Sequence, residues 1–432
     1  MPSLRVAMLS VHTCPLATLG GKETGGMNVY VRDLSRELAR RGHHVDVYTR
    51  LQDPNVPCII DGTRNRIFSE KLGSSHTKGL GRRVRVIHVP AGPKQPYSKH
   101  LVYDHLPEFV EGVLAQTKRD DVRYDVLHSH YWLSGVVAQE LRQRWGTPIV
   151  HMSHTLAKMK NAVAQRLEER EPARRIAAEM EIVRLADTLI AATPFEEEQL
   201  VRLYGADPSR IHVISPGVDV ERFHPIPAAH AKEQMGMCPE CRIILFVGRI
   251  EPLKGIDNLL QAIAQIVESR PELCEGLCVP IVGGDPDRIR QDDEMVRLQE
   301  LREELGIGDI VTFLGAKDQD TLQHYYSAAE MVVMPSDYES FGMVALEAMA
   351  CGTPVVASDV GGLSFLVKDG RTGYRVPARD PNALAAKITR LLTNEGVRRR
   401  IGQRAACWAE TYAWDHIADQ IETLYQEMTN NR

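Results

Sequence analysis

Short apolar runs alternate with helical stretches along nearly the whole chain, and this alternation limits the fold more than any other feature. The runs are rich in Val, Ile and Leu and nearly continuous, as strands are when both faces of a sheet are covered. Run, helix and run in succession predict parallel strands joined by crossover helices. The runs occupy residues 5–11, 43–49, 83–90, 125–131, 148–154, 188–193, 243–248, 278–284, 311–315, 331–336 and 354–358.

The pattern pauses once, over the Pro-rich and weakly periodic residues 215–240, and restarts at Arg242. We therefore predict two doubly wound α/β domains of similar size, joined by a linker at residues 217–241. The first domain covers residues 1–216 and the second covers 242–410. A last helix near residues 414–428 has apolar residues at helical spacing, so it must dock on another element.

Composition excludes several classes of protein. Lys plus Arg number 52 and Asp plus Glu number 57, a net charge of −5, whereas a general nucleic-acid binder usually carries a basic excess. No apolar stretch reaches the ~18 residues of a membrane span. The first strand starts almost at residue 1, with no signal segment ahead of it. These features predict a cytoplasmic protein.

Four of the eight cysteines lie at the starts of two consecutive strands: Cys238, Cys241, Cys274 and Cys278. Strand starts in a parallel sheet meet at one edge, so these thiolates could bind a structural zinc ion. The alternative interpretation is four independent reduced thiols.

The first loop after a strand contains Gly25-Gly26-Met27-Asn28 ahead of a helix. Paired glycines let the backbone approach a ligand, and the helix N-terminus favours anions, although a glycine pair is more often a tight turn. The G-x-G-x-x-G spacing is absent, and the second strand ends at Arg50 rather than at an acidic residue. Both features argue against a dinucleotide-dependent oxidoreductase.

Arg249 and Lys254 lie on the loop that leaves the first strand of the second domain. Ligands of doubly wound sheets bind at this edge, so both cations could converge on one diphosphate. Two basic loop residues are otherwise simply solvated.

The most specific motif is Glu339-Ser340-Phe341-Gly342-Met343-Val344-Ala345-Leu346-Glu347, after the strand 331–336. A helix beginning near Gly342 would direct its N–H groups at a phosphate. The two glutamates could accept hydrogen bonds from sugar hydroxyls. A helix dipole alone explains an acidic first turn, but Glu347 lies too far inside the helix.

Together these motifs resemble retaining glycosyltransferases of family 4, which have the GT-B fold. The resemblance implies two Rossmann-like domains facing a central cleft, with the last helix (residues 411–432) crossing back to the N-terminal domain. It also implies that Arg249 and Lys254 bind the donor diphosphate, Glu339 meets the donor sugar and Glu347 holds the ribose. The implied donor-binding set is Gly26, Arg249, Lys254, Glu339, Phe341, Gly342, Met343, Val344 and Glu347.

The N-terminal half resembles the inositol-phosphate N-acetylglucosaminyltransferases of mycothiol synthesis and, less closely, the sucrose-phosphate synthases. His154 would meet the donor sugar and join Arg249, Lys254 and Glu339 in catalysis. Residues 52–83 and 162–172 match neither group well. The implied acceptor-phosphate residues are Asn28, Lys99, Tyr131, Thr155, Lys160 and Arg175.

The sequence thus predicts transfer of glucose or N-acetylglucosamine from a UDP-sugar, or an ADP- or GDP-sugar, to a hydroxyl of a phosphorylated acceptor such as inositol phosphate. No cofactor or catalytic metal is expected, because Arg249, Lys254 and the helix N-terminus after Gly342 are expected to stabilise the diphosphate in place of a metal. The alternatives are glucosyl transfer to fructose 6-phosphate, a nucleotide-sugar epimerase of GT-B fold, and a non-catalytic sugar-nucleotide sensor. Whether the chain is a monomer or a homodimer stays open.

Overall fold

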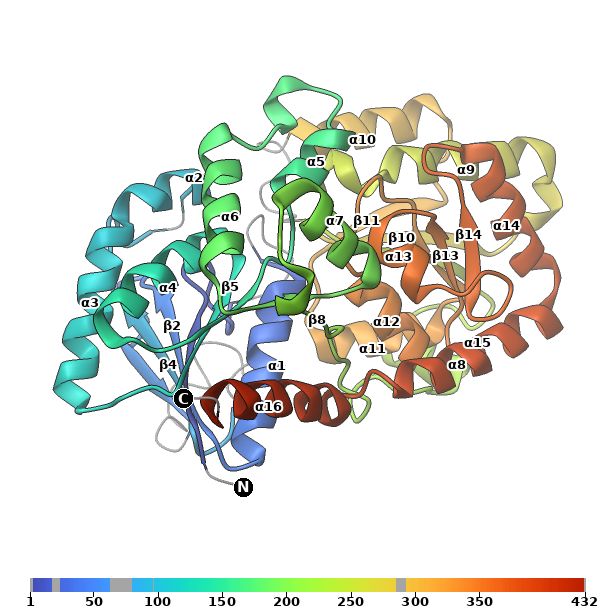
Figure 1. Cartoon of the computed structure of the whole chain (residues 1–432). Helices are drawn as coiled ribbons and strands as arrows, with labels where there is room; N and C mark the ends of the chain where they lie inside the picture. The colour runs from blue at the N-terminus through green and yellow to red at the C-terminus, as the bar shows by residue number, and fades with distance from the viewer. Residues whose placement is uncertain (1–2, 18–23, 63–79, 96, 285–292, 431–432) are drawn as a thin grey trace. The chain divides into compact units, whose positions relative to one another are not determined.

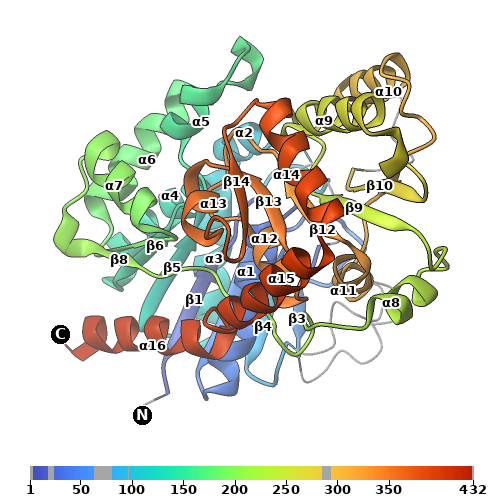
Figure 2. The same cartoon turned by 90° about the vertical axis from the view of Figure 1, so that its right-hand side faces the viewer.

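The computed structural model describes residues 3–17, 24–62, 80–95, 97–284 and 293–430. Within these ranges the chain forms two compact units (Figures 1 and 2). The N-terminal unit contains the described residues up to Gly217 together with those from Trp414 onward, and the C-terminal unit contains those of Val218–Ala413.

The N-terminal unit is built on an eight-stranded sheet in the order β3-β4-β2-β1-β5-β6-β7-β8. All neighbouring pairs are parallel except β3 and β4, which are antiparallel at one edge. The strands are β1 (Arg5–Leu9), β2 (His44–Arg50), β3 (Ile59–Asp61), β4 (Val84–Val89), β5 (Val126–His130), β6 (Ile149–Met152), β7 (Thr188–Ala191) and β8 (Ile211–Val213).

Helices cover both faces of this sheet. Helices α3 and α4 pack on one face, and α1 lies on the other beside α16. The helices are α1 (Gly26–Arg40), α2 (Lys99–Val102), α3 (Leu106–Asp120), α4 (Tyr131–Trp145), α5 (Ala157–Val163), α6 (Ala173–Leu185), α7 (Pro194–Tyr204) and α16 (Trp414–Asn430).

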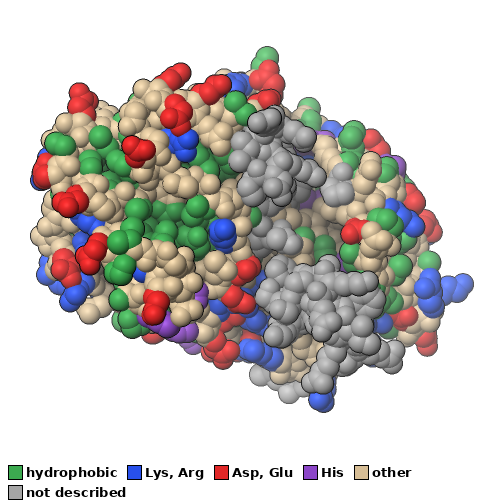
Figure 3. Space-filling view, turned by 180° about the vertical axis from the view of Figure 1, so that it is seen from behind, with side chains coloured by type: hydrophobic (Ala, Val, Ile, Leu, Met, Phe, Trp, Pro, Cys, Tyr) green, Lys and Arg blue, Asp and Glu red, His purple; other side chains and the backbone are tan. Residues whose placement is uncertain are grey.

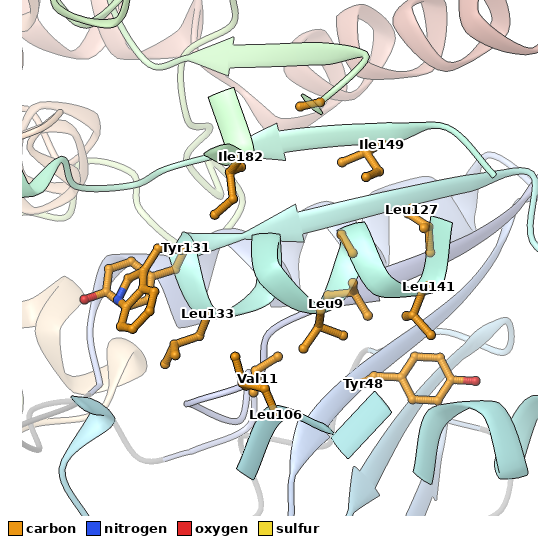
Figure 4. Packing of buried hydrophobic residues seen from close by; sticks show 14 of the residues in the cluster. Leu9, Val11, Tyr48, Leu106, Leu127, Tyr131, Leu133, Leu141, Ile149 and Ile182 are labelled. Atoms are coloured by element: carbon orange, nitrogen blue, oxygen red, sulfur yellow. The ribbon is translucent and has the colours of Figure 1, made fainter. Parts of the chain in front are cut away.

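The core under α4 follows from strand alternation, which sends successive side chains to opposite faces. Leu9 of β1 and Leu127 of β5 point to the same space as Leu133 and Leu141 of α4 (Figure 4). All four are fully buried. His128 and His130, the neighbours of Leu127 and Ser129 on β5, therefore face α1 and α16 instead, where Tyr425 and Tyr30 contact their rings.

The C-terminal unit has a six-stranded parallel sheet in the order β11-β10-β9-β12-β13-β14. Its strands are β9 (Arg242–Val247), β10 (Leu277–Val282), β11 (Val311–Gly315), β12 (Met331–Met334), β13 (Val355–Ser358) and β14 (Gly373–Val376). Its helices are α8 (Ala228–Gln234), α9 (Ile256–Ser269), α10 (Asp293–Glu304), α11 (Gln319–Ala328), α12 (Met343–Ala350), α13 (Gly361–Leu366), α14 (Pro381–Thr393) and α15 (Glu395–Glu410).

The two doubly wound parallel sheets predicted from the apolar runs are confirmed, and every predicted run overlaps a strand. The return of the last helix is also confirmed, because α16 belongs to the N-terminal unit and packs along α1. Arg41, just after α1, donates to Asp419 and to the Asp415 carbonyl of α16. Of the expected linker 217–241, all but Gly217 belongs to the C-terminal unit, where α8 packs against α11.

Lys and Arg side chains are interspersed with Asp and Glu over the face drawn in Figure 3. Neither sign of charge forms a continuous patch there, in keeping with the small net charge. Among the described residues, no helix combines the length and the apolar character that crossing a membrane requires.

Candidate functional site

In the N-terminal unit, two expected site residues sit where strands end and have left-handed backbones. Tyr131 directly follows β5 with φ +72°, and His154 lies two residues after β6 with φ +57°. Side chains other than glycine pay a steric cost in this region, so such outliers concentrate at functional sites. Only four non-glycine residues of the described chain have positive φ.

Arg175 on α6 gathers the expected phosphate-binding residues around it. The guanidinium is fully buried, donates to the Thr155 hydroxyl at 3.0 Å and lies 4.7 Å from the centre of the Tyr131 ring. It also pairs with Glu179 at 2.7 Å and with Glu171 at 2.8 Å. Burial disfavours the charged guanidinium, but Tyr131, Glu179 and Glu171 outweigh that penalty and raise the pKa of Arg175. The cation is therefore permanent.

Glu171 links Arg175 to the lysines. The Lys160 ammonium on α5 donates to the Glu171 carboxylate at 2.5 Å. Burial alone would raise the pKa of Glu171, but Arg175, Lys160 and Lys99 together lower it to about 2. The pKa of Lys160 is lowered, because burial and the repulsion from Lys99 and Arg175 outweigh the attraction of Glu171. We call Lys99, Tyr131, Thr155, Lys160, Glu171, Arg175 and Glu179 the Arg175 cluster.

Two expected residues near the start of α1 lie outside this cluster. Gly26 is the first residue of α1. The Asn28 side chain is buried, accepts a hydrogen bond from the Gly25 N–H at 2.9 Å and donates to Thr13 Oγ1 and to the Cys14 carbonyl, each at 2.7 Å. The Asn28 side chain thus holds the loop before α1 in place through hydrogen bonds. In this structure it makes no hydrogen bond with the other predicted phosphate-binding residues.

His154 is part of a row of histidines between the sheet and α1. Its Nε2 lies 2.9 Å from Nδ1 of His130, and its ring contacts the Tyr30 ring edge-on at 5.2 Å. Burial, with a smaller contribution from His151, lowers the pKa of His154 to about 3. His154 is therefore neutral near pH 7 and can donate or accept a hydrogen bond.

In the C-terminal unit, Lys254 and Glu339 form an ion pair. The Lys254 ammonium, at the end of the short 3-10 turn Pro252–Lys254 after β9, donates to Glu339 at 2.5 Å. Arg249 pairs with Glu251 at 2.8 Å. Each cation that was expected to bind a diphosphate therefore contacts a carboxylate in this structure.

Glycines set the position of the Glu339 loop, which we define as residues 337–342. Gly342 caps the start of α12 with φ +108°, so the predicted helix start near Gly342 is confirmed. Across the loop, the Gly362 N–H of α13 donates to the Glu339 carbonyl at 2.9 Å. A Cβ on Gly362 would lie 2.3 Å from the Phe341 Cα, so no larger residue fits there without a shift.

The remaining expected donor residues lie at and within α12. Phe341 is buried, with its ring centre 6.0 Å from that of Tyr412. Met343 and Val344 are half-buried in the first turn, where helical N–H groups lack intrahelical acceptors. Glu347 is buried one turn further and accepts hydrogen bonds from Tyr326 at 2.8 Å and Gln319 at 3.2 Å.

The four cysteines do not form the zinc site. Cys241 and Cys278 approach to 3.4 Å between their sulfurs, as the adjacency of β9 and β10 predicted. Cys238 is exposed in the turn before β9, and the Cys274 sulfur contacts the Arg270 carbonyl instead. Within the described ranges no group of three or more His, Cys, Asp or Glu residues could hold a metal ion. Cys241 and Cys278 are thus a contacting pair rather than two independent thiols.

The structure thus brings five of the six expected phosphate-binding residues together and leaves Asn28 apart. Glu171 and Glu179 were not predicted as members of the site. For Glu179 the spacing held a signal, because it lies four residues after Arg175 on α6, the distance at which helical side chains meet. Glu171 lies before the first residue of α6, so helical spacing does not predict its contact with Arg175. Glu251, the partner of Arg249, was missed as well, since a loop has no fixed period.

Two family matches cover most of the chain. Residues 25–217 match the family described as "Glycosyl transferase 4-like domain", and residues 232–408 match "Glycosyl transferases group 1". The first match lies within the N-terminal unit and the second within the C-terminal unit.

Similar curated proteins extend over the whole chain. It is 41% identical to a D-inositol 3-phosphate glycosyltransferase of Thermomonospora curvata, over 98% of this chain and 96% of the relative. It is 42% identical to D-inositol 3-phosphate glycosyltransferase 2 of Catenulispora acidiphila, over 98% of this chain and 94% of the relative.

Among solved structures, a sucrose-phosphate synthase from Thermosynechococcus elongatus is similar, with a TM-score of 0.87 and 35% identity. The match covers 99% of this chain and all of that one. Anabaena HepE in complex with UDP and glucose shares the fold at 20% identity, with a TM-score of 0.73 over 98% of this chain and 100% of HepE.

Proposed function

This chain belongs to glycosyltransferase family 4, with the GT-B fold, and we propose that it moves a hexose from a UDP-sugar to a hydroxyl of an inositol phosphate. The enzyme class, a retaining hexosyltransferase, comes with the family. We propose the identity of the acceptor, the nucleotide of the donor and the residues that bind both.

The Arg175 cluster carries the proposal for the acceptor. Lys99, Lys160 and Arg175 supply three positive charges and Glu171 and Glu179 two negative ones, which leaves an excess of +1 before any ligand binds. The Thr155 and Tyr131 hydroxyls add neutral donors beside the guanidinium. Two lysines, one buried guanidinium and two hydroxyls suit a phosphate monoester, whose oxygens accept several hydrogen bonds at once.

Glu171 supports the same interpretation. Its carboxylate accepts from both Lys160 and Arg175, so the cluster already stabilises an anion at this position. We propose that an acceptor phosphate binds the same cations and weakens their bonds to Glu171. The buried Arg175 would hold the phosphate in one orientation, because its own position is locked by Glu179 and Thr155.

In the C-terminal unit, we assign the donor diphosphate to Arg249, Lys254 and the N-terminus of α12. Negative charge grows on the diphosphate as the sugar leaves, and fixed donors lower that barrier. Glu339 would exchange its bond with Lys254 for the sugar hydroxyls, and Glu347 would hold the ribose. His154 of the N-terminal unit is assigned to a hydroxyl of the transferred sugar.

A second candidate is glucosyl transfer to fructose 6-phosphate. The similarity to a sucrose-phosphate synthase, 35% identical over nearly the whole chain, favours it. We rank it second because the relatives at 41% and 42% identity bear the inositol 3-phosphate name.

An acceptor screen tests the proposal. The purified chain is incubated with UDP-glucose or UDP-N-acetylglucosamine and with inositol 1-phosphate, inositol 3-phosphate or fructose 6-phosphate, and UDP release is measured. We expect release with an inositol phosphate alone. Release only with fructose 6-phosphate would establish the second candidate, and conversion of the donor without any acceptor would identify an epimerase.

Arg175→Ala tests the phosphate assignment. Loss of the buried guanidinium should raise the KM for the acceptor by about 100-fold or more, and the KM for the donor by less than about threefold. Lys254→Ala is the matched comparison, and it should impair the donor side instead. Equal effects of Arg175→Ala on both substrates would show that the Arg175 cluster does not hold the acceptor.

A further inference from the structure

We propose that His130 is a positioning residue that holds His154 in the tautomer with a proton on Nε2, so that Nδ1 of His154 presents a hydrogen-bond acceptor. This inference rests on the proposed function only for its consequence, which is that His154 accepts a hydrogen bond from a hydroxyl of the transferred sugar. The tautomer itself follows from contacts inside the N-terminal unit.

Met8 on β1 faces the His130 ring. Its sulfur lies 2.7 Å from Nε2 of His130, on the strand next to it. A thioether has no hydrogen to donate and can only accept. A nitrogen that faces it must therefore carry the proton, since two lone pairs would repel each other. This contact assigns the proton of His130 to Nε2.

His130 can carry only that one proton near pH 7. It is fully buried, and burial together with the neighbouring His128, His154 and His151 moves its pKa well below the ordinary value. In a neutral imidazole one nitrogen donates and the other accepts. Because Nε2 of His130 holds the proton, Nδ1 of His130 is an acceptor.

The acceptor on His130 fixes the state of His154. Nδ1 of His130 and Nε2 of His154 are 2.9 Å apart, a hydrogen-bond distance at which one nitrogen has to donate. His130 cannot donate from Nδ1, so His154 donates from Nε2. His154 is itself neutral, and its Nδ1 is then unprotonated. Nδ1 of His154 has no hydrogen-bond partner within the described part of the chain.

The surrounding packing holds both rings in place. Tyr30 of α1 contacts the His130 ring at 5.4 Å and the His154 ring at 5.2 Å. His128 lies 4.2 Å from the His130 ring and is bonded through Nδ1 to the Tyr425 hydroxyl of α16 at 2.6 Å. His154 reaches this row from a residue with a left-handed backbone, φ +57°. A histidine packed in this way keeps one tautomer instead of exchanging between two.

Nitrogen NMR of histidine-labelled protein tests the assignment. Protonated and unprotonated ring nitrogens have well-separated ¹⁵N shifts, and the His154→Gln variant identifies the His154 signals. We expect the signals of His154 in the wild-type protein to show protonated Nε2 and unprotonated Nδ1. The opposite pattern, or an even mixture, would overturn the proposal.

Two substitutions test the role of His130 and Met8. His130→Asn keeps an acceptor at the position of Nδ1 and should preserve the His154 tautomer, whereas His130→Leu should give a mixture. Met8→Leu removes the sulfur and should also give a mixture of the two His154 tautomers. Met331→Leu on β12 is the control for replacing a buried Met by Leu. His151, whose Nδ1 lies 2.9 Å from Ser129 Oγ, is an internal control whose signals should stay unchanged. An unaltered His154 tautomer in folded Met8→Leu would refute the argument from Met8.

Kinetics then connect the tautomer to the reaction. We expect kcat/KM to fall about twofold in Met8→Leu, because a mixture leaves about half of the molecules with an accepting Nδ1 on His154, and to recover in His130→Asn relative to His130→Leu. Wild-type turnover by His154→Gln would remove His154 from the proposed reaction. The tautomer result in the free protein would still stand, so the two failures can be told apart.

Discussion

Glu171 has two opposite effects in the Arg175 cluster. Its carboxylate neutralises Lys160 and the buried Arg175, which stabilises the folded chain. The same carboxylate is attached to the cations that we assign to the acceptor phosphate, so it competes with that ligand. Stability of the free protein and affinity for an anion are therefore set against each other at one residue.

Glu171→Gln should separate these two effects. Removing one member of a buried charge cluster leaves Arg175 without one of its partners, and we expect a loss of about 3 kcal/mol in the free energy of unfolding. Inorganic phosphate should stabilise the variant more than the wild type, because it no longer competes with a carboxylate. Thermal unfolding with and without phosphate measures both effects. Glu168→Gln, in the neighbouring 3-10 turn Leu167–Glu169, is the control, and a smaller response to phosphate in Glu171→Gln than in the wild type would contradict the prediction.

Glu196 gives the stability a dependence on pH. Its carboxylate is buried at the start of α7 and accepts from the Ala192 N–H at 2.7 Å. Burial raises its pKa from 4.5 to about 7, partly offset by that hydrogen bond. The folded state therefore binds the proton more tightly than the unfolded state, and stability is lost as the pH rises from 4.5 through 7.

We expect the wild type to lose up to about 3 kcal/mol between pH 4.5 and pH 8 relative to Glu196→Gln, which cannot ionise there. Urea unfolding of both proteins across this range provides the comparison. Parallel pH profiles of the two would show that Glu196 ionises normally.

At the scale of elements, the Glu339 loop depends on α13. The Gly362 N–H holds the Glu339 carbonyl, and a Cβ on Gly362 would press on the Phe341 Cα at 2.3 Å and on the Ser340 carbonyl oxygen at 2.4 Å. The loop sits against backbone rather than against flexible side chains. A substitution at Gly362 can therefore displace the Glu339 loop without replacing any charged residue.

Gly362→Ala should displace the Glu339 loop and lower kcat/KM by about 100-fold, as small misplacements of catalytic groups do. Binding of UDP, measured by calorimetry, should weaken in parallel. Gly396→Ala on α15 is the matched control, because its Cβ would lie 3.7 Å from its nearest neighbours. Unchanged UDP binding by Gly362→Ala would mean that the loop tolerates the shift.

The sequence predicts strands that contain an apolar run well and the strands at sheet ends less well. The eleven apolar runs all became strands, including the four-residue β6, β7, β12 and β13, whereas β3, β8 and β14 were not expected. These three lie at ends of their sheets, and their sequences IID, IHV and GYRV form no apolar run. Helix α8 was not predicted in the Pro-rich residues 215–240, because its seven residues span only two turns and show little periodicity.

At the candidate site, the sequence indicates which residues approach a ligand but not their partners. The family resemblance predicted Arg175, Lys160 and Thr155, and the fold brings Arg175 of α6 to the segment that carries Thr155 and Lys160. The contact of Met8 with His130 could not be predicted, because it depends on the register of β1 against β5. Asn28 was predicted to bind the acceptor phosphate. In the folded loop, however, its amide oxygen accepts from backbone and its amide nitrogen donates to backbone and to Thr13. The sequence pattern does not show these contacts.

At the scale of the whole molecule, the N-terminal unit is discontinuous in sequence. Helix α16 buries Trp414, Ile417, Ile421 and Tyr425, and it packs along α1. In a chain without α16, water would contact the surfaces that α16 covers, which lie on α1 and on the face of the sheet that carries His128. The described residues of the C-terminal unit, by contrast, come from the single segment Val218–Ala413.

A chain ending at Ala413 should therefore lose protection in one unit only. Burial of each large apolar side chain contributes about 1.5–3 kcal/mol. The four named ones together contribute about 6–12 kcal/mol, which is comparable with the whole stability of a typical domain, about 5–15 kcal/mol. Hydrogen exchange should become fast in α1 and β1 and stay slow in α9 and β9. Full protection of α1 in the truncated chain would show that α16 is dispensable for the N-terminal unit.

The placement of α16 also fixes an order of events during synthesis. A ribosome delivers α1 and the eight strands of the first sheet long before it delivers residues 414–430, and the entire second sheet is made in between. The N-terminal unit, which carries the Arg175 cluster, therefore stays incomplete during this time. The side of α1 that packs on α16 is exposed while the C-terminal unit can already fold. A chain that terminates anywhere within the C-terminal unit would therefore lack α16 and be released with an incomplete N-terminal unit.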